Sequence, residues 1–337
     1  MPTIDDVARA AGVSTATVSR VLNNKDVVKP ATRVLIKKVI SELNYNPSKI
    51  AQNLRNQRSA LIGIVIPDFT YYYSEILNHI EVKARHLGFS VIALSTEKDK
   101  VRERESITTL IQHSVEGLIL FSYNEDAEAQ RFLSTLYKKI PVVLMDYKSS
   151  LPISCVYTDG YLGIMQFTRS FLRQNRKRIA IIAEDTSYAA HNIRLQGYLE
   201  AFKAENSEVN PEYIVKAGMS LNAGYEAAQK LMTLPIPPEV IINIGDNTAM
   251  SVIKCCFDRG IMIPQDVEVT GFDGIALSEF TCPSLTTIKQ PIQEMAEKAV
   301  NLLFKKIENP KSRSKKIVFE PNFVFRGSTR LNKIYTE

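Results

Sequence analysis

The chain has 337 residues, of which 45% are hydrophobic and 23% are charged, as in a folded soluble protein long enough for two or three domains. No apolar run approaches the roughly 20 residues that a membrane-spanning helix needs, and the N-terminus lacks a signal-peptide core, so we expect neither a membrane partner nor export. The four cysteines have no C-x-x-C spacing and histidines are few, which predicts a cytoplasmic protein with reduced thiols, no metal and no cofactor.

The excess positive charge is confined to the N-terminus. Residues 1–58 contain ten Lys or Arg and four Asp or Glu, a net charge of +6. The whole chain also has a net charge of +6, so residues 59–337 are neutral. A compact basic module on a neutral body is typical of a DNA-binding head, although charge alone also fits a solubilising tail.

Two short helices are predicted at the start of the chain. Apolar residues recur at helical spacing between Ile4 and Ala11, where Thr3 is suited to cap the first helix and Gly12 to end it. Ser14 is suited to cap a second helix over 15–23. Two such helices joined by a glycine-containing turn indicate a helix-turn-helix, whose second helix lies in the major groove of DNA.

The outward face of the second helix carries the candidate base-reading residues, which are Thr15, Ala16, Ser19 and Arg20. Arg20 is suited to a bidentate contact with guanine, and the small Thr15 and Ala16 are suited to a thymine methyl group. A phosphate contact is the alternative for Arg20.

A third helix is predicted over 31–43. Its inward residues are expected to be Leu35, Ile36, Val39 and Leu43, and its outward cations Arg33, Lys37 and Lys38 are expected to face phosphates or solvent. Residues 48–55 form a further apolar-sided segment, too short to be a stable helix alone. That segment needs a partner helix, DNA or both.

The ordered run TIDDVARAAGVSTATVSRVLNN, then VKPATR and LNYNPSKIAQNLR, resembles the head of the lactose-repressor/galactose-repressor (LacI/GalR) family. The resemblance implies that residues 48–55 are a hinge helix, with Leu54 wedged into the minor groove at the operator centre. Without the family resemblance, the sequence predicts only that Leu54 is a core residue of a small helix. The DNA-binding positions expected in all are Thr15, Ala16, Ser19, Arg20, Thr32, Arg33, Ser48, Ala51, Leu54 and Arg55.

From Leu61 onward, apolar strand-like runs end in polar residues and alternate with helical stretches, such as 162–173 and 250–259. The runs include LIGIVIP, FSVIALS, GLILF, PVVLM, RIAIIA, VIINIG and VEVTGF. This pattern predicts parallel sheets covered on both faces, in two doubly wound lobes. Ligands of such sheets sit beyond the carboxyl ends of the strands, although each strand-end aspartate has the alternative role of capping the next helix.

The body resembles the effector-binding core of the same family, through the I-P-D after the first strand, A-x-x-x-R-x-x-G-Y at 190–198, and GFDGIALSEF. The resemblance implies periplasmic-binding-protein-like lobes with an effector between them. The expected contacts are Tyr72, Tyr73, Asp159, Arg194, Asp246 and Asp273. Glycines at 160, 245 and 274 replace polar residues common in the family, so the polar set is thin. A sugar or sugar phosphate is the expected effector, and a nucleobase or nucleoside is the alternative.

The fold class expected is therefore α/β: a three-helix helix-turn-helix head with a hinge helix, then two parallel-sheet lobes. The domain boundaries expected are 1–46 for the head, 47–59 for the hinge and linker, 60–160 with 290–321 for the first lobe, and 161–289 with 322–337 for the second. Partners are expected to be palindromic double-stranded operator DNA, a carbohydrate effector and a second copy of the chain in a homodimer. Whether the effector induces or corepresses is left open by the sequence.

Competing classes are an exported sugar receptor and an enzyme. The basic head and the missing signal segment argue against the receptor. No nucleophile, metal set or phosphate loop accompanies the strand-end aspartates, so we expect no enzyme activity. The charged run Lys98–Glu105 is expected to be a solvated helix face, and His191 is expected either in the cleft or on the surface, since it lies three residues before Arg194.

Overall fold

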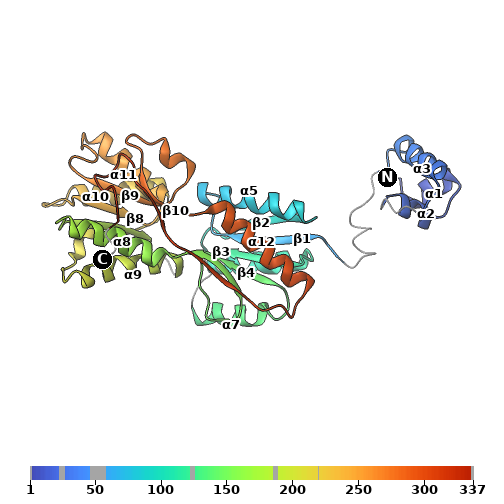
Figure 1. The fold of residues 1–337 in the computed structure, drawn as a ribbon, viewed down its shortest axis with the longest axis horizontal. Coiled ribbons are helices and arrows are strands. Elements are labelled where there is room, and N and C mark those ends of the chain that lie inside the picture. Colours follow the sequence, from blue (N-terminus) through green and yellow to red (C-terminus); the bar gives the residue numbers. More distant parts are fainter. Residues whose placement is uncertain are drawn as a thin grey trace. The chain divides into compact units, whose positions relative to one another are not determined.

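The computed structural model of the protein describes residues 2–22, 27–45, 58–121, 126–184, 189–218 and 220–334. These form two compact units, Met1–Ala60 and Leu61–Glu337, which we call the head and the body and describe separately (Figure 1). The predicted hinge positions Ser48, Ala51, Leu54 and Arg55 lie outside the described residues.

The described head consists of helices α1 (Ile4–Ala11), α2 (Thr15–Leu22) and α3 (Pro30–Glu42). The predicted caps are confirmed. The Thr3 hydroxyl accepts a hydrogen bond from the backbone N–H of Asp6, and Gly12 ends α1 with φ of 65°, a left-handed conformation that glycine adopts without steric cost. Ser14 accepts from the backbone N–H of Thr17 at 3.3 Å and so caps α2.

The three helices share one apolar core, formed by Val7, Ala8, Ala11, Val18, Val21, Ile36 and Val39. The prediction that Leu35 points inward is wrong, because its side chain is 44% exposed while Ile36 is fully buried. Apolar residues at 35 and 36 cannot both face the core, since neighbouring positions on a helix point about 100° apart. The packing against α1 selects Ile36.

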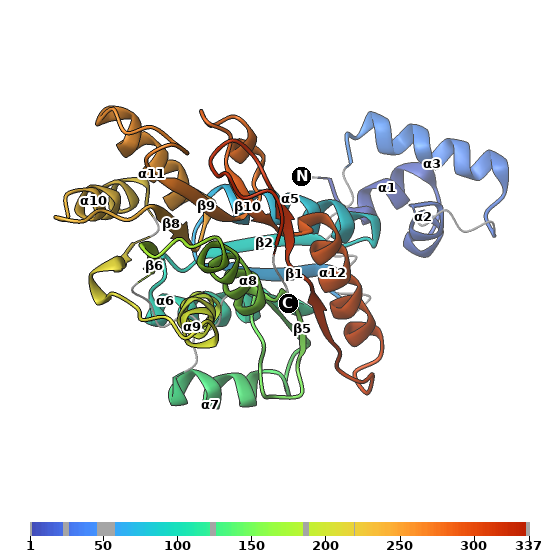
Figure 2. The same cartoon turned by 60° about the vertical axis from the view of Figure 1, so that its left-hand side comes forward.

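The first sheet of the body has the order β11-β5-β4-β3-β1-β2 and is parallel. Helices α5 and α12 pack on one of its faces and helices α6 and α7 on the other, as the core clusters show (Figure 2). The elements are β1 (Leu61–Ile66), α5 (Tyr71–His86), β2 (Ser90–Ser95), α6 (Lys100–Gln112), β3 (Gly117–Phe121), α7 (Ala127–Leu136), β4 (Val142–Met145), β5 (Ser154–Thr158), α12 (Ile292–Glu308) and β11 (Lys316–Phe319).

The second sheet has the order β12-β10-β9-β8-β6-β7, with only the β10–β12 pair antiparallel. Its elements are α8 (Gly160–Arg173), β6 (Ile179–Glu184), α9 (Ala189–Ala204), η1 (Pro211–Tyr213), β7 (Ile214–Ala217), α10 (Leu221–Met232), β8 (Val240–Asn243), α11 (Asp246–Asp258), β9 (Glu268–Asp273), η2 (Ala276–Glu279), β10 (Thr286–Lys289) and β12 (Asn322–Val324). The predicted α/β fold with two parallel-sheet lobes is confirmed.

The chain passes from one sheet to the other three times: after β5, after β10, and between β11 and β12. Each parallel strand enters its sheet in the same direction, so the polar residues that follow the strands gather at one edge of each lobe. Within the described residues, none of the helices combines the length and the apolar character needed to cross a bilayer.

Candidate functional site

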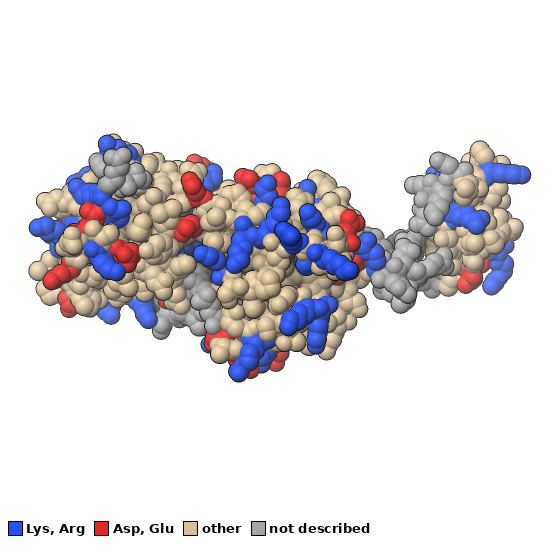
Figure 3. Space-filling model, turned by 60° about the horizontal axis from the view of Figure 1, so that its bottom comes forward, with Lys and Arg blue, Asp and Glu red and all other residues tan. Residues whose placement is uncertain are grey.

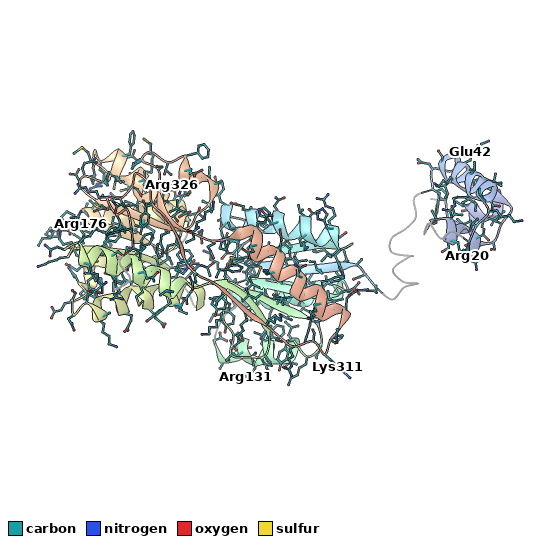
Figure 4. All side chains as sticks on the ribbon, viewed as in Figure 1. Arg20, Glu42, Arg131, Arg176, Lys311 and Arg326 are labelled. Atoms are coloured by element: carbon teal, nitrogen blue, oxygen red, sulfur yellow. The ribbon has the colours of Figure 1, made fainter. Side chains whose placement is uncertain are left out.

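The head offers one outward helix face with the predicted base-reading residues. On α2, Val18 and Val21 are buried in the core, which turns Ala16 and Arg20 to solvent and leaves Thr15 and Ser19 half-buried at the side of the face. Figure 4 shows Arg20 and the acidic Glu42 on opposite sides of the head. Small side chains beside one exposed guanidinium fit the requirements of a helix that enters a groove.

Two further predicted contacts lie at the start of α3. Thr32 and Arg33 are both half-buried there, within a helix that begins at Pro30 and whose lysines at 37 and 38 are exposed. Position N1 suits proline because its missing N–H would have no partner in a helix. The cations therefore project from a helix held in place by Ile36 and Val39.

The body contains a cavity of about 250 Å³ between its two lobes. Its lining comes from the loop after β4, from the passage between β5 and α8, from α9, and from Gln290. A smaller cavity of about 30 Å³ shares Asp146 and Arg194 with it and reaches Tyr72, Tyr73, Lys98, His191, Asn247 and Asp273. The two cavities together form what we call the cleft. It collects residues from strand ends of both sheets, as expected for this architecture.

Arg194 is the central cation of the cleft. It is only 6% exposed, and its Nη1 donates to the carbonyl oxygen of Ile244 at 2.5 Å. The guanidinium carbon lies 3.7 Å from the ring centroid of Phe272, and Nη1 lies 3.9 Å from Oδ1 of Asp273. A Cβ at Gly160 would lie 3.0 Å from the Arg194 side chain, so the glycine leaves this cation room. The guanidinium is thus fixed before any ligand arrives.

Asp146 is the main acid on the opposite lobe. The hydroxyl of Tyr72 contacts both of its carboxylate oxygens at 2.8 Å, and burial raises the pKa of Asp146 to about 6. Tyr73 packs edge-on against Tyr72 and Phe121, with ring centroids 5.1 and 5.7 Å away. The predicted tyrosine pair therefore contributes differently at each position: Tyr72 orients an acid, and Tyr73 supplies apolar wall.

Two cleft aspartates have unusual backbones. Asp146 has φ of 58° and Asp273 has φ of 113°, both positive and unfavourable for a residue with a side chain. Asp273 accepts a hydrogen bond from Nε2 of Gln290 at 2.9 Å, and burial raises its pKa. Strained backbone that aims polar groups at a cavity is a common feature of binding sites.

The other two predicted aspartates, Asp159 and Asp246, differ in whether their carboxylates can reach a ligand in the cleft. Asp159 lines the larger cavity while it caps α8, accepting from the backbone N–H of Leu162 at 3.0 Å. Asp246 is fully buried and lines neither cavity. Its oxygens accept from Thr287 Oγ1 at 2.6 Å and from the backbone N–H of Ile275 at 2.9 Å. The geometry does not support Asp246 as an effector contact, because both oxygens are occupied inside the second lobe.

An ion-pair cluster connects the lobes beside the smaller cavity. Lys98 of the first lobe lies 2.6 Å from Glu184 and 3.6 Å from Asp68, and Nδ1 of His191 contacts the other Glu184 oxygen. Burial opposes the charge on Glu184, yet His191 and Lys98 lower its pKa to about 2. His191, left open by the sequence, is buried in the cleft. The prediction that Lys98–Glu105 is a solvated face is wrong at Lys98, which spans the lobes.

Sequence reasoning missed several cleft residues. Asp68, Asp146 and Glu184 all follow or end predicted strands, where ligands of such sheets are expected, but the family resemblance that selected Asp246 did not include them. Lys98 and Asn247 carried no comparable signal, because one lies in a charged run and the other inside a helix. Figure 3 shows Lys and Arg interspersed with Asp and Glu on the visible face of the body, in keeping with its neutral charge.

Comparisons with known proteins agree with this architecture. Residues 3–48 match the profile described as bacterial regulatory proteins, lacI family, and residues 168–329 match a periplasmic binding protein-like domain. The chain is 32% identical to the ribose operon repressor of Escherichia coli K12, across 97% of this chain and all of that one.

Two solved structures resemble the whole chain. The lac repressor dimer bound to operator and the anti-inducer ONPF superposes with a TM-score of 0.87 at 25% identity, covering 97% of this chain and 99% of that one. The complex of the transcriptional regulator CelR with cellobiose has a TM-score of 0.71 at 26% identity, covering 97% and 100%. From its head, its two lobes and its full-length similarity to these regulators, the chain belongs to the lacI family of bacterial regulatory proteins.

Proposed function

We propose that the protein is a transcriptional repressor whose affinity for operator DNA is set by a small hydroxylated ligand bound in the cleft. The observation that carries the proposal is the fixed guanidinium of Arg194 between two lobes, in the same chain as a helix-turn-helix head. The ligand biases the angle between the lobes and thereby the pairing of two heads. By linkage, DNA must alter ligand affinity by the same factor.

The DNA contacts we assign are Thr15, Ala16, Ser19 and Arg20 in the major groove, Thr32 and Arg33 near the backbone, and the hinge positions Ser48, Ala51, Leu54 and Arg55. Because one head reads few base pairs, we assign the working form as a homodimer on a palindromic operator. The lac repressor, similar over the full length, is a dimer on its operator.

The cleft favours a neutral ligand over a phosphorylated one. The two cavities are lined by four aspartates and three Lys or Arg side chains, so a phosphate would meet a surplus of acids. Vicinal hydroxyls donate to carboxylates and accept from a guanidinium, and an aromatic wall suits a sugar ring. We therefore assign an unphosphorylated sugar, as in the CelR–cellobiose complex, with a nucleoside as the alternative. Tyr72, Tyr73, Asp159, Arg194 and Asp273 would hold it, together with Asp146.

The remaining assignments follow from the same reasoning. We assign a regulator without enzyme activity, supported by relatives that are repressors, and a cytoplasmic location beside its DNA target. We assign the head to residues 1–46, the hinge to 47–59, and the lobes to 60–160 with 290–321 and 161–289 with 322–337. The sheet membership of β11 and β12 supports the last pair of boundaries.

A thermal-shift screen of sugars, sugar phosphates and nucleosides on the full-length protein tests this function. A ligand at 100 times its dissociation constant adds about 2.7 kcal/mol of stability if it binds only the folded state. The ligand found must then change the affinity for a palindrome selected from random duplexes. A ligand that stabilises the protein without altering DNA affinity contradicts the proposal.

Arg194→Ala is the matched variant for the cleft, and Arg176→Ala is its control. Arg176 also pairs with a buried acid, Glu268, at 2.8 Å, but it does not line the cleft (Figure 4). We expect Arg194→Ala to weaken ligand binding by at least about 100-fold, because a charge-assisted contact is lost in a buried site, while Arg176→Ala binds normally. Equal ligand affinity of the two variants would show that Arg194 does not contact the ligand.

A further inference from the structure

A third cavity lies on the first lobe and is lined by residues of α6 and α7 and by Asp126, which precedes α7. Its volume is about 180 Å³, and it shares no lining residue with the two cavities of the cleft. The lining residues are Lys100, Val101, Glu103, Arg104, Ile107, Asp126, Glu128, Ala129 and Phe132. It is therefore a separate space, on the sheet face opposite α5 and α12.

Glu103 is the unusual member of this lining. It is only 6% exposed, and its carboxyl has no hydrogen-bond or ion-pair partner among the described residues. Charged side chains are rarely this buried unless they are paired, because a carboxyl loses most of its hydration there. The predicted solvated face at 98–105 is therefore wrong at Glu103 as well. Since a leucine would fill this position without burying an unpaired polar group, apolar packing alone does not require the acid.

The cations near Glu103 are already engaged by other acids. Nζ of Lys100 lies 3.0 Å from Asp126, and Nη1 of Arg104 lies 2.7 Å from Glu128. Both ion pairs run from α6 to α7 at the rim of the cavity, where all four side chains are more than 40% exposed. The lining thus contains three acids and two bases, and the Glu103 carboxyl has no cation of its own among the described residues.

The wall of the cavity suits a cation that carries carbon. The guanidinium of Arg104 already lies 5.1 Å from the ring centroid of Phe132, which shows that this ring accepts positive charge. Ile107 and Ala129 add apolar surface. A divalent metal ion does not fit, because it needs about six oxygen ligands and only one carboxyl here is unengaged.

We propose that this cavity binds a small organic monocation, a primary alkylammonium group, with Glu103 as its anionic anchor and Phe132 and Ile107 as its apolar wall. The ammonium head donates to the Glu103 carboxylate between the two ion pairs, and the alkyl chain lies along the apolar wall. Burial of the Glu103 carboxyl destabilises the folded protein, and the bound ammonium group offsets this destabilisation. This site gives the protein a second small ligand, independent of the cleft.

Titration calorimetry of the full-length protein with n-butylammonium chloride at pH 8 tests the site. Glu103→Gln removes the charge and keeps the shape, and Glu105→Gln removes the same charge from an exposed position of the same helix. We expect saturable binding to the wild type and to Glu105→Gln, at least tenfold weaker binding to Glu103→Gln, and no binding of the neutral isostere n-butanol. Equal affinity of all three proteins, or no binding to the wild type, overturns the proposal.

Phe132→Leu supplies a second variant that does not depend on the buried charge. It keeps an apolar side chain in the wall but removes part of the flat apolar surface along which the alkyl chain lies, so we expect butylammonium affinity to fall about two- to fivefold. Thermal unfolding of each variant confirms that it is folded before titration. Unchanged affinity in Phe132→Leu would contradict the placement of the alkyl chain along this ring.

Discussion

The head and the cleft both present charged side chains, but those of the head are exposed to solvent and those of the cleft are buried. On α2 the apolar residues are buried and Arg20 is exposed, so the side chain that we propose for DNA contact is one that the core packing does not use. In the cleft Arg194 is 6% exposed, and it is held by a carbonyl, an aromatic ring and an acid. We therefore expect DNA binding by the head to depend on charge and salt, and ligand binding in the cleft to depend on preorganised buried contacts.

Ionic strength gives the largest expected separation between the two regions. A head that makes six phosphate contacts loses about 10³-fold in DNA affinity when salt rises from about 50 to about 200 mM, because bound counterions are released. Binding of a neutral ligand in the cleft should change less than about twofold, since buried contacts are poorly screened. Fluorescence anisotropy with operator DNA and calorimetry with the ligand measure the two in the same buffers. A DNA affinity indifferent to salt would contradict the role of the basic head.

Asp246 and Asp159, both predicted as effector contacts, have different roles: Asp246 is buried inside the second lobe, and Asp159 lines the cleft. Asp246→Ala leaves the Thr287 hydroxyl and the Ile275 N–H without an acceptor, so we expect the free energy of unfolding to fall by about 2–4 kcal/mol. Asp159→Ala removes only a helix cap and should cost about 1 kcal/mol, while it weakens ligand binding. Urea unfolding and ligand titration measure both. The assignment fails if the two variants lose the same stability and the same affinity.

The contrast also explains what the sequence could predict. Periodicity located α1, α2 and seven of the body strands, because a helix face or a buried strand leaves a repeating pattern. Periodicity failed at Leu35, because only one of the two adjacent apolar residues Leu35 and Ile36 can face the core. It also failed at Lys98 and Glu103, because residues of one charged run lie in different environments, and the run itself gives no sign of this. Strand ends identified a set of aspartates, but hydrogen bonds from Thr287 and Ile275, distant in sequence, decide that Asp246 is occupied.

Glu103 gives a prediction for stability against pH. Burial raises its pKa from 4.5 to about 8, so between these values the folded protein holds a proton that the unfolded chain releases. Stability contributed by this group is therefore complete below pH 4.5 and is lost as pH rises to 8, by at most about 1.4 kcal/mol per pH unit. Glu103→Gln should lose less stability than the wild type between pH 5 and pH 8.

Urea midpoints at pH 5, 6, 7 and 8 measure the effect, and Glu105→Gln should follow the wild type. Burial also raises the pKa of Asp146 and Asp246, but these groups act equally in all three proteins, and the difference between the curves isolates Glu103. Glu184, with its pKa lowered to about 2, matters only at lower pH. If stability depended on pH equally in Glu103→Gln and the wild type, the Glu103 carboxyl would not have the raised pKa on which this prediction rests.

Arg20 provides the finest test of how the head reads DNA. If its guanidinium contacts guanine, Arg20→Ala should weaken operator binding by about 1–3 kcal/mol and relax specificity at one base pair of each half-site. Arg33→Ala, which removes a backbone-facing cation, should instead weaken all sequences alike and lower the salt slope by about one. Binding to a library of single-base operator variants at two salt concentrations separates these outcomes. Since Arg20 is exposed and Val18 and Val21 hold the helix, its removal leaves the fold intact, and a uniform loss across the library would assign Arg20 to phosphate.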